Sequence, residues 1–198
     1  MKPSNGFTLT RIIFAPIFFL LYFVPIWTGL FPRLSIIIAL PLLCFAEFTD
    51  FLDGYYARKH NEVSDFGKLF DPFADVILHM TTFACLMFSA GTTGGYTPRF
   101  IFILIMYREM AQNFLRMIAA KKGVAIAARK GGKIKTVSYV VTGFYALFLE
   151  ILVRFDCIPE GFGVLKIVSI CLFIISLILS YASFTDYLIH FGKTFKEI

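Results

Sequence analysis

Four aspartates between residues 50 and 75 are the side chains whose type and spacing best suit chemistry. Asp50 and Asp53 are three residues apart, and Asp71 and Asp75 are four apart. On helices each pair projects from one face, so two facing helix ends would bring four carboxylates to one point. Carboxylate oxygens are hard ligands, and the pattern therefore predicts a site for divalent cations.

The residues between the two pairs favour a phosphate-bearing ligand. Gly54, Ala57 and Gly67 remove side-chain bulk, which lets a nucleotide or pyrophosphate approach the backbone closely. Arg58 adds a fixed positive fork that suits phosphate or carboxylate. Long apolar runs flank the segment, and a carboxylate at the centre of a membrane helix costs about 2.5 to 3.5 kcal/mol. Acidic residues in such a place are functional candidates by default.

Written as a pattern, D-x2-D-G-x2-A-R-x8-G-x3-D-x3-D resembles the signature of the CDP-alcohol phosphotransferase family at every defining position. The signature covers positions 50 to 75 only. The alternative is a set of juxtamembrane carboxylates paired with Arg58, Lys59 and Lys68, since paired structural charges do occur in membranes.

The resemblance implies a fold, a reaction and roles for individual residues. The fold is an all-α membrane bundle, and the reaction is displacement at the β-phosphorus of a CDP-linked donor by an alcohol, with release of CMP. The resemblance further implies two Mg²⁺ or Mn²⁺ ions and a homodimer. The implied roles are Asp50, Asp53 and Asp71 as ligands, Asp71 bridging, Asp75 as ligand and general base, and Gly54, Ala57, Arg58 and Gly67 lining the CDP pocket.

Composition predicts a polytopic membrane protein. Of 198 residues, 58% are hydrophobic and only 16% charged, with a mean hydropathy of +0.77. We expect one membrane-embedded domain over residues 1–198. The net charge of +6 suggests cytoplasmic loops and anionic lipid or phosphate ligands before nucleic acid. The cysteines form no C-x2-C pair and are interpreted as small buried hydrophobes: Cys44, Cys85, Cys157 and Cys171.

Apolar runs predict six transmembrane helices, the first retained as a span rather than cleaved. The expected ranges are about 10–30, 34–58, 66–90, 100–118, 135–153 and 165–188. The segment between the fourth and fifth, AAKKGVAIAARKGGKIKT, is basic without any acid, which places it in the cytoplasm by the positive-inside rule. Counting spans then puts both termini and the acidic site on the cytoplasmic side. The family and the lack of an organelle signal favour a bacterial inner membrane.

Two further sets of polar residues lie near the predicted site. Asn5, Thr8 and Arg11 share one face of the first helix start, where they would hold a headgroup or cytidine, or simply anchor the helix at the interface. His79 lies one turn beyond Asp75, either touching the site or hydrogen-bonded inside the bundle.

Four cations form a candidate site for the acceptor alcohol. Arg108 and Arg116 share a face of the fourth helix with Gln112, and this polar stripe should point inward. With Lys133 and Lys135 at the next helix start, they suit an acceptor that carries its own phosphate dianion. The alternative is that the lysines only set the topology of a basic cytoplasmic loop.

Outside the signature, the chain is most similar to the bacterial phosphatidylglycerolphosphate synthases of this family. The supporting motifs are N-x2-T-x2-R from Asn5, Arg108-Glu109 with Leu115-Arg116, GKIKT from Gly132, and Ser183 with Asp186-Tyr187. The implied reaction joins CDP-diacylglycerol and glycerol 3-phosphate into phosphatidylglycerol phosphate and CMP. Two departures concern the acceptor: Val76 stands where a Lys is usual, and Glu47 where a small residue is usual.

Three other functions are compatible with parts of the pattern. The same chemistry with another acceptor, such as inositol phosphate, serine, a choline-type headgroup or phosphatidylglycerol, keeps every site residue. A divalent-cation transporter would use the aspartates as an intramembrane site, but these acids flank a hydrophilic turn instead. An inactive scaffold is disfavoured because all four aspartates are present.

Overall fold

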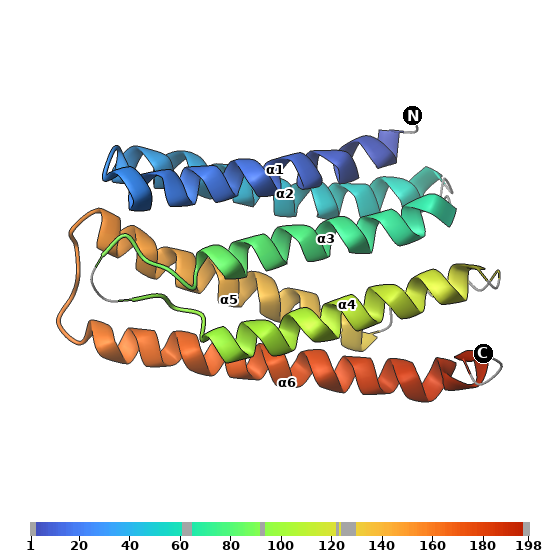
Figure 1. Ribbon diagram of the computed structural model, residues 1–198. Coiled ribbons are helices and arrows are strands. Elements are labelled where there is room, and N and C mark those ends of the chain that lie inside the picture. The colour runs from blue at the N-terminus through green and yellow to red at the C-terminus, as the bar shows by residue number, and fades with distance from the viewer. Residues whose placement is uncertain (1–2, 61–64, 92–93, 122, 124–129, 196–198) are drawn as a thin grey trace.

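Over the residues that it describes, the computed structural model forms six long α-helices (Figure 1). The described residues are 3–60, 65–91, 94–121, 123 and 130–195, of which 3–5, 7, 50–60, 65–68, 130 and 192–195 are described by their backbone alone. No strand occurs among the described residues. The helices are α1 (Pro3–Thr28), α2 (Pro32–His60), α3 (Asp65–Cys85), α4 (Arg99–Lys121), α5 (Lys130–Arg154) and α6 (Phe162–Phe195).

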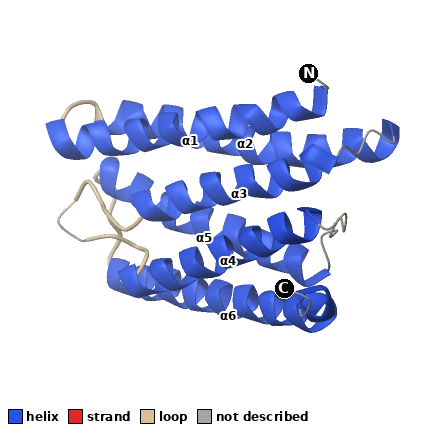
Figure 2. Ribbon diagram, turned by 45° about the vertical axis from the view of Figure 1, so that its right-hand side comes forward, coloured by secondary structure: helices blue, strands red, loops and turns tan. Residues whose placement is uncertain are grey.

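The helices run side by side, each antiparallel to the next along the chain (Figures 1 and 2). α1 packs against α2 and α3, α4 lies between α3 and α6, and α5 pairs with α6 while also reaching α2 and α3. This alternation brings six helix ends to one end of the bundle: the starts of α1, α3 and α5 and the ends of α2, α4 and α6. We call this the site end and the opposite one the far end.

The burial pattern is that of a membrane protein, with charges inside and apolar side chains outside. Arg108, Glu109, Glu150 and Arg154 are buried, whereas large apolar residues are exposed along α1, α2, α5 and α6. In water the reverse arrangement is the rule. In a bilayer the charges face the bundle interior, where they can pair with one another.

Four of the six predicted spans are confirmed as long and apolar enough to cross a membrane. They are Thr8–Thr28, Pro32–Thr49, Gly131–Arg154 and Phe162–Phe191. α3 and α4 have 21 and 23 residues, about the length that a bilayer requires, but are not among these four. The fold class, an all-α membrane bundle, is as the sequence predicts.

The helices differ most from the predicted spans at four ends. Three helices are longer than predicted: α1 begins at Pro3 rather than near residue 10, α5 begins at Lys130 rather than near residue 135, and α6 ends at Phe195 rather than near residue 188. The third span is instead shorter than predicted. α3 ends at Cys85, five residues before the predicted end at Ala90, because the chain turns back on itself there. The backbone N–H groups of Tyr96 and Thr97 donate to the Leu86 carbonyl at 2.7 and 3.1 Å. Gly95 permits this return, since a Cβ there would lie 2.0 Å from the Met87 carbonyl oxygen.

The prediction that the cysteines are buried is wrong for three of the four. Only Cys85 is buried, whereas Cys44, Cys157 and Cys171 are exposed, and all four are free thiols. Cys157 lies in the α5–α6 connection, whereas Cys44 and Cys171 lie in apolar runs of membrane helices, which have a lipid-facing side as well as a packed one. Hydropathy therefore does not indicate burial here.

A buried ion pair joins four segments at the far end. Arg154 Nε lies 2.7 Å from Glu150 Oε1 on the same helix, and both side chains are fully buried. The Arg154 guanidinium also donates to Ser35 Oγ of α2 at 2.7 Å and to the Tyr22 carbonyl of α1 at 2.8 Å. Glu150 accepts from the Tyr96 hydroxyl at 2.9 Å, which joins the α3–α4 connection to the same pair.

Arg154→Met should destabilise the protein strongly, because it leaves the Glu150 carboxylate buried without its cation. Removal of one partner of a buried pair costs about 3 to 5 kcal/mol. We expect a large loss of melting temperature for the purified protein in detergent. Arg33→Met is the matched control, since Arg33 and Asp156 form an exposed pair at 2.9 Å. Equal melting temperatures for the two variants would contradict this role of Arg154.

Candidate active site

Two of the four predicted site aspartates, Asp71 and Asp75, are described at the site end, one turn apart on α3. The Thr8 hydroxyl donates to Asp71 Oδ1 at 2.5 Å, and the Arg11 guanidinium pairs closely with Asp75. Arg11 Nη2 also lies 4.0 Å from Asp71 Oδ1. Thr8 and Arg11 therefore serve the α3 carboxylates, a role that neither sequence interpretation of these residues included.

Accessibility distinguishes the carboxylates from the cation that holds them. The Arg11 side chain is 1% exposed, whereas those of Asp71 and Asp75 are 43% and 29% exposed. A buried guanidinium is a fixed charge with little freedom to move. The two carboxylates are thus held from inside the bundle and remain open to a ligand from the site end.

The other half of the predicted cation site lies outside the described side chains. This applies to Asp50 and Asp53, and equally to Gly54, Ala57, Arg58 and Gly67 of the predicted CDP pocket. The backbone of α2 continues through Asp50 to His60 without a break. Among the side chains that are described, no group of three or more acids, histidines and cysteines gathers as a metal site. The oxygen donors of Asp71 and Asp75, partly exposed and one turn apart, fit a hard divalent cation.

The Glu109 carboxylate contacts two of the four cations that are predicted to bind the acceptor alcohol. Arg108 Nη1 lies 2.7 Å from Glu109 Oε1, and Lys135 Nζ lies 3.0 and 3.1 Å from the two carboxylate oxygens. The Tyr139 hydroxyl donates to the same carboxylate at 2.9 Å and lies 2.8 Å from Ser180 Oγ of α6. This buried group links α4, α5 and α6, and we call it the Glu109 cluster.

The remaining two cations are not held by the Glu109 cluster. Arg116 lies two turns beyond Arg108 on α4, and its buried Nε has no hydrogen-bond partner among the described residues. Lys133 is exposed in the first turns of α5. Gln112 and Arg108 are buried, which confirms that the polar stripe of α4 points inward. Neither Lys133 nor Arg116 forms an ion pair with a carboxylate among the described side chains.

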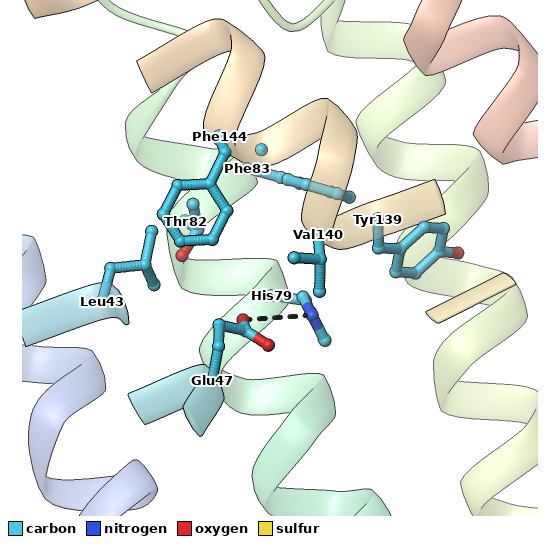
Figure 3. A pocket seen from close by; sticks show the side chains of 9 residues that line it. Leu43, Glu47, His79, Thr82, Phe83, Tyr139, Val140 and Phe144 are labelled. Carbon is cyan, nitrogen blue, oxygen red and sulfur yellow. Dashed lines mark ion pairs between the residues drawn. The ribbon is translucent and has the colours of Figure 1, made fainter. Parts of the chain in front are cut away.

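His79 pairs with Glu47 rather than with the aspartates (Figure 3). Its Nε2 lies 3.4 Å from Glu47 Oε1, across the space between α3 and α2. A small cavity of about 10 Å³ adjoins them, also lined by Thr82 and Tyr139. Of the two sequence interpretations of His79, a polar residue inside the bundle is the one this contact supports.

Sequence reasoning missed the residues that organise the site from a distance. The sequence identifies Glu109 only as part of the Arg108-Glu109 motif, and it gives no signal for Tyr139. Glu47 departs from the small residue that is usual at its position, and a carboxylate in a membrane helix is expected to have a partner. Val76, the other departure, is buried in the hydrophobic core.

Comparison with known proteins assigns the chain to a family. The sequence profile described as CDP-alcohol phosphatidyltransferase matches residues 1–181. A protein of Treponema pallidum (strain Nichols) named CDP-diacylglycerol–glycerol-3-phosphate 3-phosphatidyltransferase is 36% identical, over 100% of this chain and 93% of its own length. A Bacillus subtilis (strain 168) protein of the same name is 36% identical over 69% of this chain and 72% of its own. A Mycobacterium tuberculosis (strain ATCC 25618 / H37Rv) protein named probable phosphatidylglycerophosphate synthase is 32% identical over 74% and 66%. The chain belongs to the CDP-alcohol phosphatidyltransferase family.

Proposed function

We propose that the protein transfers the phosphatidyl group of CDP-diacylglycerol to glycerol 3-phosphate, giving phosphatidylglycerol phosphate and CMP. Family membership makes it a membrane transferase. The names of the Treponema and Bacillus relatives supply the two substrates. The observation that carries the proposal is the pair of accessible carboxylates on α3, held by a buried arginine at the same end of the bundle as the cations of α4 and α5.

Members of this family generally depend on a divalent cation, and the donor set of this chain suits one. Asp50, Asp53, Asp71 and Asp75 would hold it, and we propose two ions, Mg²⁺ or Mn²⁺. When bound, such ions supply charge stabilisation at the phosphoryl oxygens. Gly54, Ala57, Arg58 and Gly67 would line the pocket of the CDP moiety.

Asp75 is the proposed general base. The hydroxyl oxygen of glycerol 3-phosphate forms a bond to the β-phosphorus, the bond to the CMP oxygen breaks, and the hydroxyl proton passes to the Asp75 carboxylate. Arg11 orients that carboxylate from within the bundle. A positioned base of this kind contributes about 10² to 10⁴ in rate.

The acceptor phosphate is assigned to the cations of α4 and α5. Arg116 and Lys133 would contact the dianion directly, since neither forms an ion pair among the described side chains. Arg108 and Lys135 share the single carboxylate of Glu109, so their combined charge stays positive. A neutral acceptor such as serine would not need this excess of cations.

We also propose the setting in which the reaction takes place. All six helices of the single domain, residues 1–198, would cross a bacterial inner membrane, with the site end and both termini in the cytoplasm. The basic residues of the α4–α5 segment lie in sequence between two helix ends at the site end, and the positive-inside rule then orients the bundle. We propose a homodimer, as the family resemblance implies.

The reaction is tested with purified protein, CDP-diacylglycerol and one alcohol at a time. We expect CMP release with glycerol 3-phosphate and little with inositol phosphate, serine, choline or phosphatidylglycerol. A chelator should abolish the release, and added Mg²⁺ or Mn²⁺ should restore it. Release with another alcohol and none with glycerol 3-phosphate would overturn the acceptor assignment.

Asp75→Asn should lower kcat by about 10² to 10⁴, because the amide cannot accept the hydroxyl proton. Binding of the CDP-lipid should change much less, and both are measured on the same preparation. Asp156→Asn is the matched control, since that aspartate lies in the α5–α6 connection at the far end. Near-normal turnover in Asp75→Asn would remove this residue from its role as base.

Arg116→Gln should raise the KM for glycerol 3-phosphate by about tenfold to a hundredfold, since a charged hydrogen bond is worth about 1.5 to 3 kcal/mol. The KM for CDP-diacylglycerol should change little. Arg33→Gln, an exposed arginine at the far end, serves as control. Equal effects of Arg116→Gln on both KM values would argue against a contact with the acceptor phosphate.

A further inference from the structure

Glu47 of α2 and His79 of α3 form an ion pair that joins the two helices directly. Figure 3 shows the two side chains reaching toward each other from their separate helices. Their closest atoms, Glu47 Oε1 and His79 Nε2, are 3.4 Å apart.

Glu47 and His79 lie close in sequence to the aspartates of α2 and of α3, respectively. Glu47 lies three residues before Asp50 in α2, and His79 lies four residues after Asp75 in α3, so each is about one helical turn from an aspartate. The pair therefore joins the two helices one turn deeper in the bundle than the carboxylates.

The surroundings of the pair offer few other polar partners to Glu47 or His79. His79 is 7% exposed, and its ring packs 5.8 Å from the Tyr139 ring and 6.5 Å from the Phe83 ring. The adjoining cavity is lined mainly by apolar side chains, and its volume of about 10 Å³ suits at most one water molecule. A slip of α2 along α3 by one turn, about 5.4 Å, would separate the two groups in an apolar interior. Such a separation is strongly disfavoured.

We propose that Glu47 and His79 are positioning residues that fix the register of α2 against α3. They thereby set how the aspartates of α2 stand relative to Asp71 and Asp75. This inference rests on the proposed function, in which carboxylates of both helices hold the divalent cation. Neither residue contacts the reacting groups, and their effect reaches the site through the helices that carry them.

The test is the affinity of the purified protein for Mn²⁺, measured by the electron paramagnetic resonance of the free ion without any lipid substrate. Glu47→Gln and His79→Gln should each weaken Mn²⁺ binding by about tenfold or more, the range known for residues that orient metal ligands. The double variant should lose little more than either single one. Glu47→His combined with His79→Glu reverses the pair and should recover most of the affinity.

The matched control is Thr82→Val. Thr82 lines the same cavity, but its hydroxyl donates to the Leu78 carbonyl of its own helix at 2.9 Å. This variant should bind Mn²⁺ as the wild type does. Helical content and a monodisperse elution identify the folded variants. If the single variants do not fold, a folded charge-reversed variant decides the question: recovered affinity supports the inference, and a tenfold loss overturns it.

Two results separate this inference from the proposed function. Wild-type protein that binds Mn²⁺ and releases CMP, with single variants of unchanged Mn²⁺ affinity, would overturn the role of Glu47 and His79 alone. Wild-type protein that neither binds Mn²⁺ nor releases CMP with any alcohol would overturn the proposed function, and this inference with it.

Discussion

Charge pairing inside an apolar bundle is the constraint on which the rest of the structure depends. Hydrocarbon offers a buried cation no solvent, so an anion close by in the bundle stabilises it. Arg11 of α1 meets Asp75 of α3, and Lys135 of α5 meets Glu109 of α4. Arg154 meets Glu150 on its own helix but also reaches α1 and α2. These contacts link the helices where apolar packing alone would allow them to slide.

The two ends of the bundle use this constraint in different ways. At the far end the Glu150 carboxylate accepts from Arg154, Ser89, Tyr96 and the Ala90 backbone, and both charged side chains are fully enclosed. Such a saturated group has no capacity left for a ligand. At the site end Asp71 and Asp75 remain partly exposed. Stability and function are thus assigned to opposite ends of the same helices.

The sequence predicted the local features well and the partners poorly. Residues three or four apart share a helix face, so the spacing predicted that Asp71 lies beside Asp75 and that Arg108 and Gln112 share one face. That this polar face points inward was predicted from the cost of exposing arginine to lipid. The partner of Arg11 lies 64 residues away, and no periodicity reports a contact at that separation. The early end of α3 was missed for a related reason. The hydropathy of FSA at residues 88–90 continues that of the helix, while the return of Tyr96 to Leu86 depends on the tertiary fold.

The two departures from the phosphatidylglycerolphosphate synthase pattern have local structural explanations that leave the proposed acceptor site intact. Val76 packs in the hydrophobic core, where its apolar side chain is fully compatible with the surroundings. Glu47 has its own partner in His79, so it withdraws no cation from the α4 and α5 set. The charges proposed to meet a phosphate dianion, Arg116 and Lys133 with the positive Glu109 cluster, belong to other helices. Because neither substitution changes their charge balance, the proposed preference for a phosphorylated alcohol rests on α4 and α5 rather than on the motif itself.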